Sequence, residues 1–272
     1  MELSQRVKES KLVMLRSVQP WFMLGSKHCN TLVTSNSELT SHFYSFEFNG
    51  SYDLTNTAIP DGCIDILFDC SSDTPSAYLC GTTLEASEAD FIHGHNYFGV
   101  RFRPGVIPGF VNLLPQELIS NRLNLNDVIS NITTIIEKVV SNDNFLERSK
   151  IVSSFILQTK NRPNSYLTSD IIEYIIKSNG SIQIRDLAAI TRCSERTLQR
   201  RFRDDLGLTP KAFCRIIRCQ SALYRINHGE NINLSELAFE LGFSDQAHFQ
   251  REFKKSINET PYGYKIKTTS II

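Results

Sequence analysis

The sequence carries the same basic segment twice near its C-terminus. TLQRRFRDDLGLTP occupies 197–210 and HFQREFKKSINETP occupies 248–261. In register, the letters Q-R-x-F and the closing T-P of the first copy recur 51 residues later. Self-similarity at a fixed offset is typical of a structural unit that is used more than once. The chain therefore has to fold two similar units and hold them at a defined separation.

Each copy has the pattern of an amphipathic helix. In the first copy, Leu198, Phe202 and Leu206 recur every four residues and form one apolar stripe. Ser194 is a good N-cap before the stripe, and Gly207 suits the residue after the helix. Arginines and a glutamine lie on the opposite face. A basic helix face is more often simply exposed to solvent than part of a binding surface. The segments that precede each copy are therefore needed to distinguish these two interpretations.

Those preceding segments favour a helix-turn-helix arrangement. IQIRDLAAITRCS and INLSELAFELGFS each read as a short helix containing Leu-Ala, followed by a tight turn. Gly242 suits such a turn in the second copy, which has one extra residue before its basic helix. In a helix-turn-helix the second helix enters the major groove of DNA. The repeat therefore predicts two recognition helices in one chain.

The segment between the copies predicts a long helix. Thr209 can cap it, Pro210 fits its first turn, and Gly229 ends it. A helix of about 17 residues is about 26 Å long. This length is comparable with the ~34 Å that separates successive major-groove faces of B-DNA. One chain is thus expected to present both recognition helices to the same side of a duplex.

Residues 168–267 resemble the DNA-binding domain of AraC/XylS-type transcription regulators. The resemblance rests on IRDLAAITRCSERTLQRRFRDDLGLTPKAF and on LSELAFELGFSDQAHFQREFKKSINETPYGY. Every fixed letter of the family signature A-x-x-x-G-F-S-x-x-x-x-F-x-R-x-F-K-x-x-x-x-x-T-P is present, from Ala238 to Pro261. The resemblance implies a transcription regulator, such as an activator, that binds double-stranded promoter DNA and acts with RNA polymerase. It implies no enzymatic activity and no cofactor.

By position, the family's recognition helices fall on 194–206 and 245–257. Arg can bond guanine or phosphate, and Gln can bond adenine edges or phosphate. Ala247 offers only an apolar contact, so the second helix is expected to supply more affinity than base discrimination. The predicted DNA-binding residues are Ser194, Arg196, Thr197, Gln199, Arg200, Arg203, Gln246, Ala247, Gln250, Arg251 and Lys254.

The remainder of the chain predicts an α+β organisation. SHFYSFEF, GCIDILFD, SAYLCGT and YFGVRFRP are short, aromatic or β-branched, and separated by turn signals, which indicates antiparallel strands. This spacing predicts an antiparallel sandwich or barrel over 1–105, and the resemblance implies a β-rich, cupin-like domain there with sensory or regulatory function. A helical segment follows over 106–160, then a linker over 161–167, then the all-α domain over 168–267, whose two helix-turn-helix motifs are joined by the long helix.

The helical segment has two alternative uses. Ile129, Ile132, Ile136 and either Val139 or Val140 form one apolar face. This face either packs on the chain's own β domain or forms the seam of a homodimer, as in the resembled family.

The ligand of the N-terminal domain is not fixed by its sequence. IPDGCIDILFD and FGVRFRPG are similar to segments of uncharacterised N-terminal domains in the same family. The domain either binds a small-molecule effector or serves only oligomerisation or protein interaction. Candidate effector ligands are Asp61, His95, Arg101 and Arg103, because inward-facing arginines bind carboxylates or phosphates. His93 and His95 would share one face of a strand, but no third metal ligand follows, so no metal site is predicted.

Composition and charge agree with a cytoplasmic regulator. The net charge is zero, yet 164–272 contains 16 basic and 12 acidic residues, leaving an acidic N-terminal part. A basic module beside an acidic one suits contact of one part with nucleic acid. No run approaches 18 apolar residues, and the charged stretch 1–25 lacks a signal-peptide core. The seven scattered cysteines are expected to be reduced and buried.

Overall fold

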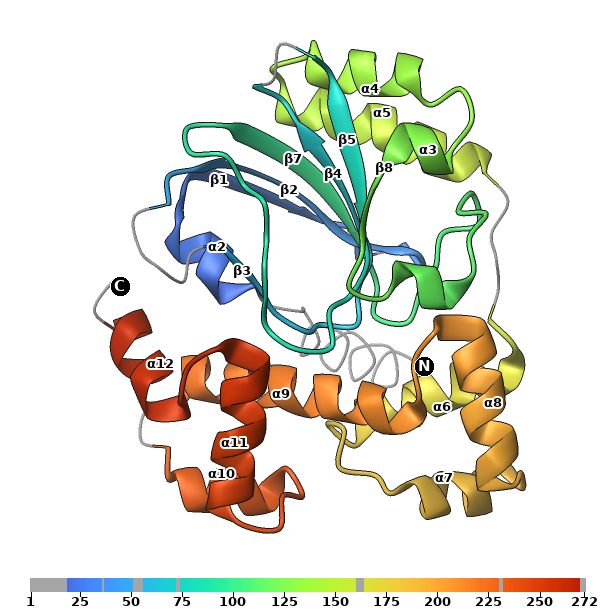
Figure 1. Ribbon diagram of the computed structural model, residues 1–272, viewed down its shortest axis with the longest axis vertical. Coiled ribbons are helices and arrows are strands. Elements are labelled where there is room, and N and C mark those ends of the chain that lie inside the picture. The colour runs from blue at the N-terminus through green and yellow to red at the C-terminus, as the bar shows by residue number, and fades with distance from the viewer. Residues whose placement is uncertain are drawn as a thin grey trace, which may run out of the picture.

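The computed structural model describes residues 19–35, 37–50, 56–71, 74–159, 164–229 and 232–269. A β-rich part and an all-helical part lie against each other (Figure 1), which confirms the α+β organisation. The charged stretch 1–18 and positions 161–163 of the expected linker fall outside the described residues.

All pairings in the β-rich part are antiparallel. Strands β2, β4, β5 and β7 coincide with the four predicted segments. The six-stranded sheet has the order β1-β2-β7-β4-β5-β8, and a two-stranded pair β3-β6 stands apart. The strands are β1 (Ser26–Val33), β2 (Thr40–Phe48), β3 (Thr57–Ala58), β4 (Asp65–Asp69), β5 (Ser76–Cys80), β6 (Ser87–Glu88), β7 (Asn96–Phe102) and β8 (Arg122–Asn124).

The central strand β7 separates two cores. Alternate side chains of a strand point to opposite faces, so Phe98 and Val100 enter the main core below the helices, whereas Tyr97 joins a smaller aromatic cluster on the other face. Both faces of β7 are covered, and its residues from Tyr97 to Phe102 are buried.

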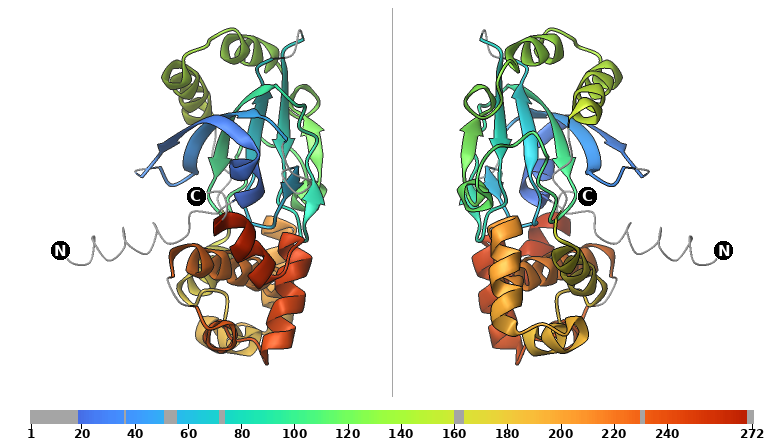
Figure 2. Two further views of the ribbon diagram at one scale, coloured as in Figure 1. Left: turned by 90° about the vertical axis from the view of Figure 1, so that its left-hand side faces the viewer. Right: turned by 90° about the vertical axis from the view of Figure 1, so that its right-hand side faces the viewer.

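Helices α4 (Thr133–Val140) and α5 (Phe145–Gln158) lie over one face of the sheet (Figures 1 and 2). Ile132, Ile136 and Val139 are buried in the main core, so the predicted apolar stripe packs on the chain's own sheet. The stripe is therefore not available as a dimer seam.

The region expected to be helical over 106–160 is interrupted. Positions 122–124 form strand β8, which pairs with β5, so the helical prediction is wrong there. Asn131, with φ 61°, breaks the predicted helix into α3 (Leu125–Val128) and α4. A 3₁₀ turn η1 (Pro115–Leu118) and a short helix α2 (Pro20–Leu24) complete this part.

The helical part is built around α9 (Pro210–His228). With 19 residues it is two longer than expected, about 28 Å. Gly229 follows it as predicted. The other helices are α6 (Tyr166–Lys177), which begins inside the expected linker, α7 (Ile184–Thr191), α8 (Glu195–Leu206), α10 (Leu234–Glu240), α11 (Gln246–Ile257) and α12 (Pro261–Thr269).

All seven cysteines are unpaired thiols. Burial raises the pKa of Cys80 and of Cys219 to about 12, which makes both poor nucleophiles. Cys29 is exposed on β1, so the expectation of burial is wrong for this residue. Within the described ranges, no helix is long and apolar enough to cross a membrane.

The packing of α4 predicts unequal effects for two apolar truncations. Ile136 is 1% exposed, so Ile136→Ala should lower the free energy of unfolding by about 2–5 kcal/mol. Leu157 on α5 is 83% exposed, and Leu157→Ala should change it by less than about 0.5 kcal/mol. Urea denaturation followed by circular dichroism measures both. A loss for Ile136→Ala that depends on protein concentration would instead indicate a dimer seam.

Candidate nucleic-acid interface

The first helix-turn-helix consists of α7, a three-residue turn and α8. The turn needs a left-handed residue, and Arg192 takes that conformation with φ 53°. The Ser194 hydroxyl then accepts a hydrogen bond from the backbone N–H of Thr197 at 3.2 Å, which caps α8 as predicted. Gly207, with φ 74°, follows the last turn. The apolar stripe is buried, so the opposite face of α8 points to solvent.

The second helix-turn-helix consists of α10, its turn and α11. Gly242 has φ 74°, as its place in the turn requires. The extra residue of this copy is used for capping: Asp245 precedes the helix and accepts a hydrogen bond from the backbone N–H of His248 at 2.6 Å. This bond lowers the pKa of Asp245, which therefore carries its negative charge beside the helix N-terminus. The recognition helix starts at Gln246, one residue later than expected.

Both recognition helices lie on the same side of the helical part. In the two side views of Figure 2, α8 and α11 occupy the same outer edge, with α9 behind them. Residues from both halves of α9 build the two motifs: Phe213 and Ile217 belong to the core around α8, whereas Ala222 and Leu223 belong to the core around α11. The separation of the recognition helices is thus set by one continuous helix.

The predicted contact residues are largely open to solvent. Thr197 and Gln246 are half-buried, the latter accepting a hydrogen bond from the Ser235 hydroxyl at 2.6 Å. Arg196, Arg200 and Arg251 form no ion pair with any residue in the described ranges. The exposed members are Ser194, Arg196, Gln199, Arg200, Arg203, Ala247, Gln250, Arg251 and Lys254.

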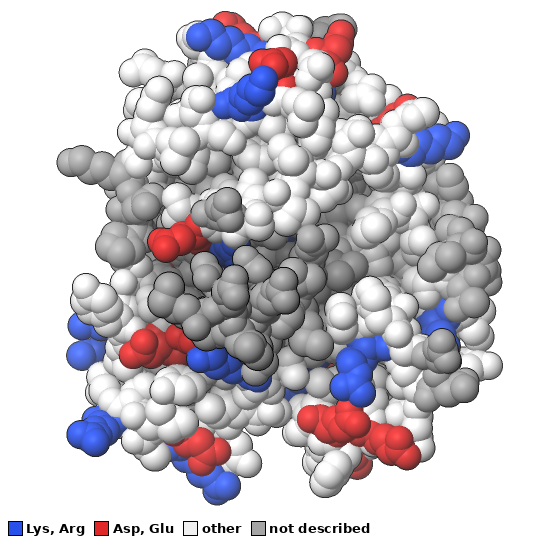
Figure 3. Space-filling model, turned by 180° about the vertical axis from the view of Figure 1, so that it is seen from behind, with Lys and Arg blue, Asp and Glu red and all other residues white. Residues whose placement is uncertain are grey.

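The opposite face of the molecule is not uniformly basic. Figure 3 shows Lys and Arg interspersed with Asp and Glu across both halves of the helical part on that side. Since Arg196 and Arg200 of α8 form no ion pair within the part of the chain that the structure describes, the recognition face is the better match for a polyanion.

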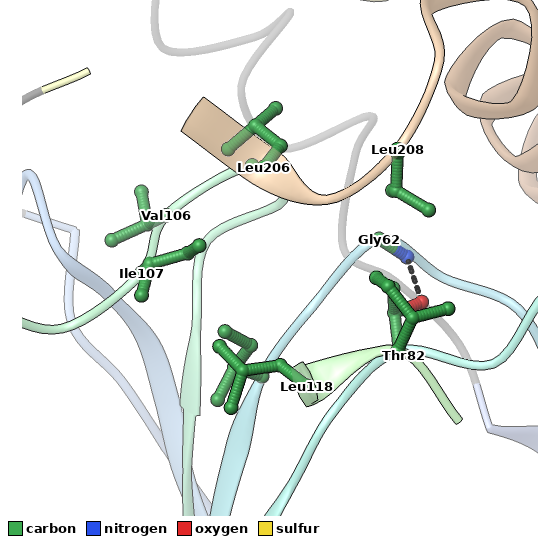
Figure 4. A pocket seen from close by; sticks show the side chains of 10 residues that line it. Gly62, Thr82, Val106, Ile107, Leu118, Leu206 and Leu208 are labelled. Carbon is green, nitrogen blue, oxygen red and sulfur yellow. Dashed lines mark hydrogen bonds between the residues drawn. The ribbon is translucent and has the colours of Figure 1, made fainter. Parts of the chain in front are cut away.

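The β-rich part contacts the C-terminal end of α8. The Gln116 side chain donates a hydrogen bond to the Arg203 carbonyl at 2.9 Å. Leu206 and Leu208 face Ile107 and Leu118 across a small apolar gap (Figure 4). The approach is close enough that a Cβ on Gly207 would lie 2.4 Å from the Pro115 carbonyl oxygen.

The C-terminal end of α11 is held in the same way. The backbone N–H of Ala86 donates to the Lys255 carbonyl at 3.1 Å, and Lys255 pairs with Glu85 at 2.8 Å. The indole N–H of Trp21 donates to the Ile257 carbonyl at 2.8 Å. One β-rich part therefore touches the trailing ends of both recognition helices.

Two residues from the N-terminal half enter the core of the second motif. Trp21 and Ile59 are 2% and 1% exposed and pack with the buried residues of α9, α10 and α11. The Trp21 ring meets the Tyr264 ring edge-on, with centroids 5.5 Å apart. In addition, Gln220 of α9 donates to the Pro60 carbonyl at 2.8 Å. The two parts thus share a core.

A buried ion-pair cluster lies behind this contact. Arg101 on β7 bonds Asp61 at 3.0 Å and Asp65 on β4 at 2.9 Å. Burial raises the pKa of Asp61, and the negative charge of Asp65 adds to the effect, while Arg101 opposes it. The Gln19 amide bonds both Asp61 and the Ile59 carbonyl at 2.8 Å. The cluster therefore fixes the loop 59–63 that reaches α9.

The predicted effector residues only partly come together. Asp61 and Arg101 are adjacent, whereas His95 pairs with Asp69 at 2.9 Å at the other end of β4. Arg103 lies beyond β7 and donates to the Ser37 carbonyl at 2.8 Å.

The two predicted histidines do not share a strand face. They sit in the turn before β7, so that interpretation of His93 and His95 is wrong. No group of three or more metal-ligating side chains occurs among the described residues. Asp65 was not among the predicted effector residues. It meets Arg101 because the two residues are paired across β4 and β7, and this pairing depends on the strand register.

A cavity of about 130 Å³ opens beside the cluster. It lies between the face of the sheet that carries Arg101 and the segment 80–91. Tyr44 lines it with Arg101, and its hydroxyl donates to Asp65 at 3.1 Å.

Comparison with known proteins separates the two parts. Residues 187–266 match a helix-turn-helix domain family, and residues 37–124 match a domain family of unknown function (DUF6597). The transcriptional activator RhaR of Enterobacter sp. is 31% identical over 87 residues, 32% of this chain and 30% of RhaR. The activator RhaS of Escherichia coli is 34% identical over 68 residues, 25% of this chain and 24% of RhaS.

Residues 187–266 form an AraC-type helix-turn-helix domain. The chain spans less than a third of the length of these curated relatives, which are transcriptional activators. A probable AraC family regulator from Rhodopseudomonas palustris is 27% identical, covering 38% of this chain and 97% of its own, with a TM-score of 0.34. ToxT from Vibrio cholerae is 14% identical, covering 88% and 96%, with a TM-score of 0.43.

The shared core predicts that the AraC-type domain depends on Trp21. Trp21→Phe keeps an aromatic ring but leaves the Ile257 carbonyl without its donor, which should cost about 1 kcal/mol of unfolding free energy. Trp21→Ala also opens a cavity and should cost about 3–5 kcal/mol. Urea denaturation measures both.

Met23→Ala on the same short helix is the matched control, because Met23 is 68% exposed. Equal losses for Trp21→Ala and Met23→Ala would contradict the shared core. Trp21 is the only tryptophan of the chain, so its fluorescence in the parent protein reports this one contact.

Proposed function

We propose that this chain is a transcription regulator that binds duplex DNA with α8 and α11. The observation that carries the proposal is the placement of two helix-turn-helix motifs on one side of a single domain, each with an exposed polar helix face. This arrangement suits two adjacent major-groove segments. The activator names of RhaR and RhaS support the same class of function.

The two helices contribute unequally in this proposal. Arg196, Arg200 and Gln199 are exposed on α8 and supply donors for guanine, adenine or phosphate. At the leading end of α11, Ala247 is exposed and offers only a methyl group, while Gln246 is tied to Ser235. Base discrimination is therefore assigned mainly to α8, and α11 mainly adds affinity.

We assign DNA binding to 168–267 and signal reception to 1–105, with 106–160 as a connecting helical segment. The hydrogen bonds from the β-rich part to α8, α9 and α11 support this division, since a change in that part reaches both motifs. Reception of a small-molecule effector is favoured over a purely oligomerising role by the cavity beside Arg101. Promoter DNA as partner implies action in the cytoplasm.

Two further partners belong to the proposal. RNA polymerase follows from the activator class of the relatives. A homodimer would have to use a surface other than the stripe of α4, and the exposed Leu146 on α5 lies on one such surface.

Footprinting tests the proposal directly. A monomer should protect two major-groove segments on one side of the duplex, about one helical turn apart. Binding should also weaken steeply with added salt, because Lys and Arg displace counterions from phosphates. Protection of a single groove segment, or affinity that does not change with salt, would refute the bipartite interface.

The unequal roles of the helices predict a difference between two sets of variants. Arg196→Ala should relax base preference at its position, with a loss of about 1–3 kcal/mol for the preferred base. Gln250→Ala and Arg251→Ala should weaken binding to all sequences by similar factors. Binding selections on randomised DNA measure both effects. If the α11 variants changed base preference as much as Arg196→Ala, the assignment would be wrong.

A further inference from the structure

The cavity beside Arg101 is large enough for a small ligand. Its volume is about 130 Å³. A protein cavity of about 150 Å³ holds a molecule the size of benzene. The apolar gap between Leu206 and Leu118 is only about 20 Å³, room for little more than one water. Of these two spaces, only the first suits an organic molecule.

The lining of this cavity carries an excess of negative charge. Four carboxylates line it but only two guanidiniums, an excess of two negative charges. The lining groups are Asp61, Asp65, Glu88 and Asp90 against Arg101 and Arg122. Arg101 is shared between Asp61 and Asp65, and burial together with the repulsion of Asp65 raises the pKa of Asp61. A further positive charge beside this pair would therefore be favoured.

The walls suit an organic cation better than a metal ion. The rings of Phe22, Tyr44 and Phe91 line the same space. Aromatic faces attract organic cations and cover their apolar parts. Among the described residues, the buried hydroxyl oxygen of Thr83 also lacks a hydrogen-bond partner, and Thr83 lines the cavity. This oxygen can accept a hydrogen bond from an ammonium group.

We propose that this cavity binds a small organic cation, an amine with an apolar body about the size of a benzene ring. The amine lies near the carboxylates of Asp61 and Asp65, and the body lies against the aromatic walls. The proposal rests on the proposed function, because it names the class of effector that the N-terminal domain would receive.

The cavity is connected to the AraC-type domain through the loop 59–63. Asp61 belongs to the loop 59–63, whose Pro60 carbonyl accepts a hydrogen bond from Gln220 of α9. Ile59 of the same loop is buried in the core of the second motif. A cation that draws Asp61 away from Arg101 therefore acts on the contact between this loop and α9.

Three probes of equal size separate charge from shape. Thermal unfolding of the full chain, without DNA, is measured with benzylamine, benzyl alcohol and benzoate at the same concentrations. Benzylamine should raise the unfolding midpoint by a few degrees at millimolar concentration, because a ligand of the folded state stabilises it. Benzyl alcohol should do so less, and benzoate should not. A larger shift with benzoate, or no shift with benzylamine, would overturn the proposal.

Two matched variants locate the effect. Glu88→Gln removes a charge at the exposed rim of the cavity without touching the buried cluster, and should weaken benzylamine binding about three- to tenfold by calorimetry. Glu137→Gln removes an equally exposed charge on α4, away from the cavity, and should leave binding unchanged. Equal effects of the two variants would place the cation elsewhere and refute the site.

Because these measurements contain no DNA, their failure leaves the footprinting result intact. Conversely, benzylamine binding in a chain that does not footprint DNA would support the cavity and refute the regulator.

Discussion

The structure depends on the burial of α9 in two cores at once. Its first half packs with α8 through Phe213 and Ile217, and its second half packs with α11 through Ala222 and Leu223. A close-packed interior tolerates little relative movement of its elements. The two recognition helices are therefore positioned by one rigid segment, and anything that shifts α9 changes both. The separation of the two recognition helices therefore depends more on this connecting helix than on the identity of the two repeated segments.

The buried Arg101 cluster decides where the β-rich part meets α9. Buried ion pairs are weak evidence for stability, because the cost of removing charges from water offsets their attraction. Their geometry is nevertheless specific. Arg101 pairs with Asp61 at 3.0 Å, and Asp61 belongs to the loop 59–63 that accepts the hydrogen bond from Gln220. We infer that the cluster contributes mainly to the placement of this loop. The cation proposed for the neighbouring cavity would thus act where the two parts touch.

The features that the sequence predicted correctly are local ones. The caps at Ser194 and Gly207 and the apolar stripe of α8 depend on residues within one or two turns, so periodicity and spacing reveal them. Periodicity and spacing do not predict contacts between distant segments, such as the hydrogen bond between Trp21 and Ile257, which are 236 positions apart. Asp65 faces Arg101 only through strand register. Strand β8 likewise depends on its pairing with β5, a distant segment. The break at Asn131 is local, because Asn adopts the left-handed conformation more readily than most residues.

The place at which the β-rich part touches the recognition helices limits how it can regulate them. In a helix-turn-helix, residues near the start of the recognition helix contact base edges. The contacts from the β-rich part fall instead on the last turn of each helix, at Arg203 on α8 and at Lys255 and Ile257 on α11. The leading residues, including Arg196 and Ala247, stay exposed. A signal from the β-rich part would therefore act by tilting or respacing the two helices rather than by covering the surface that meets DNA.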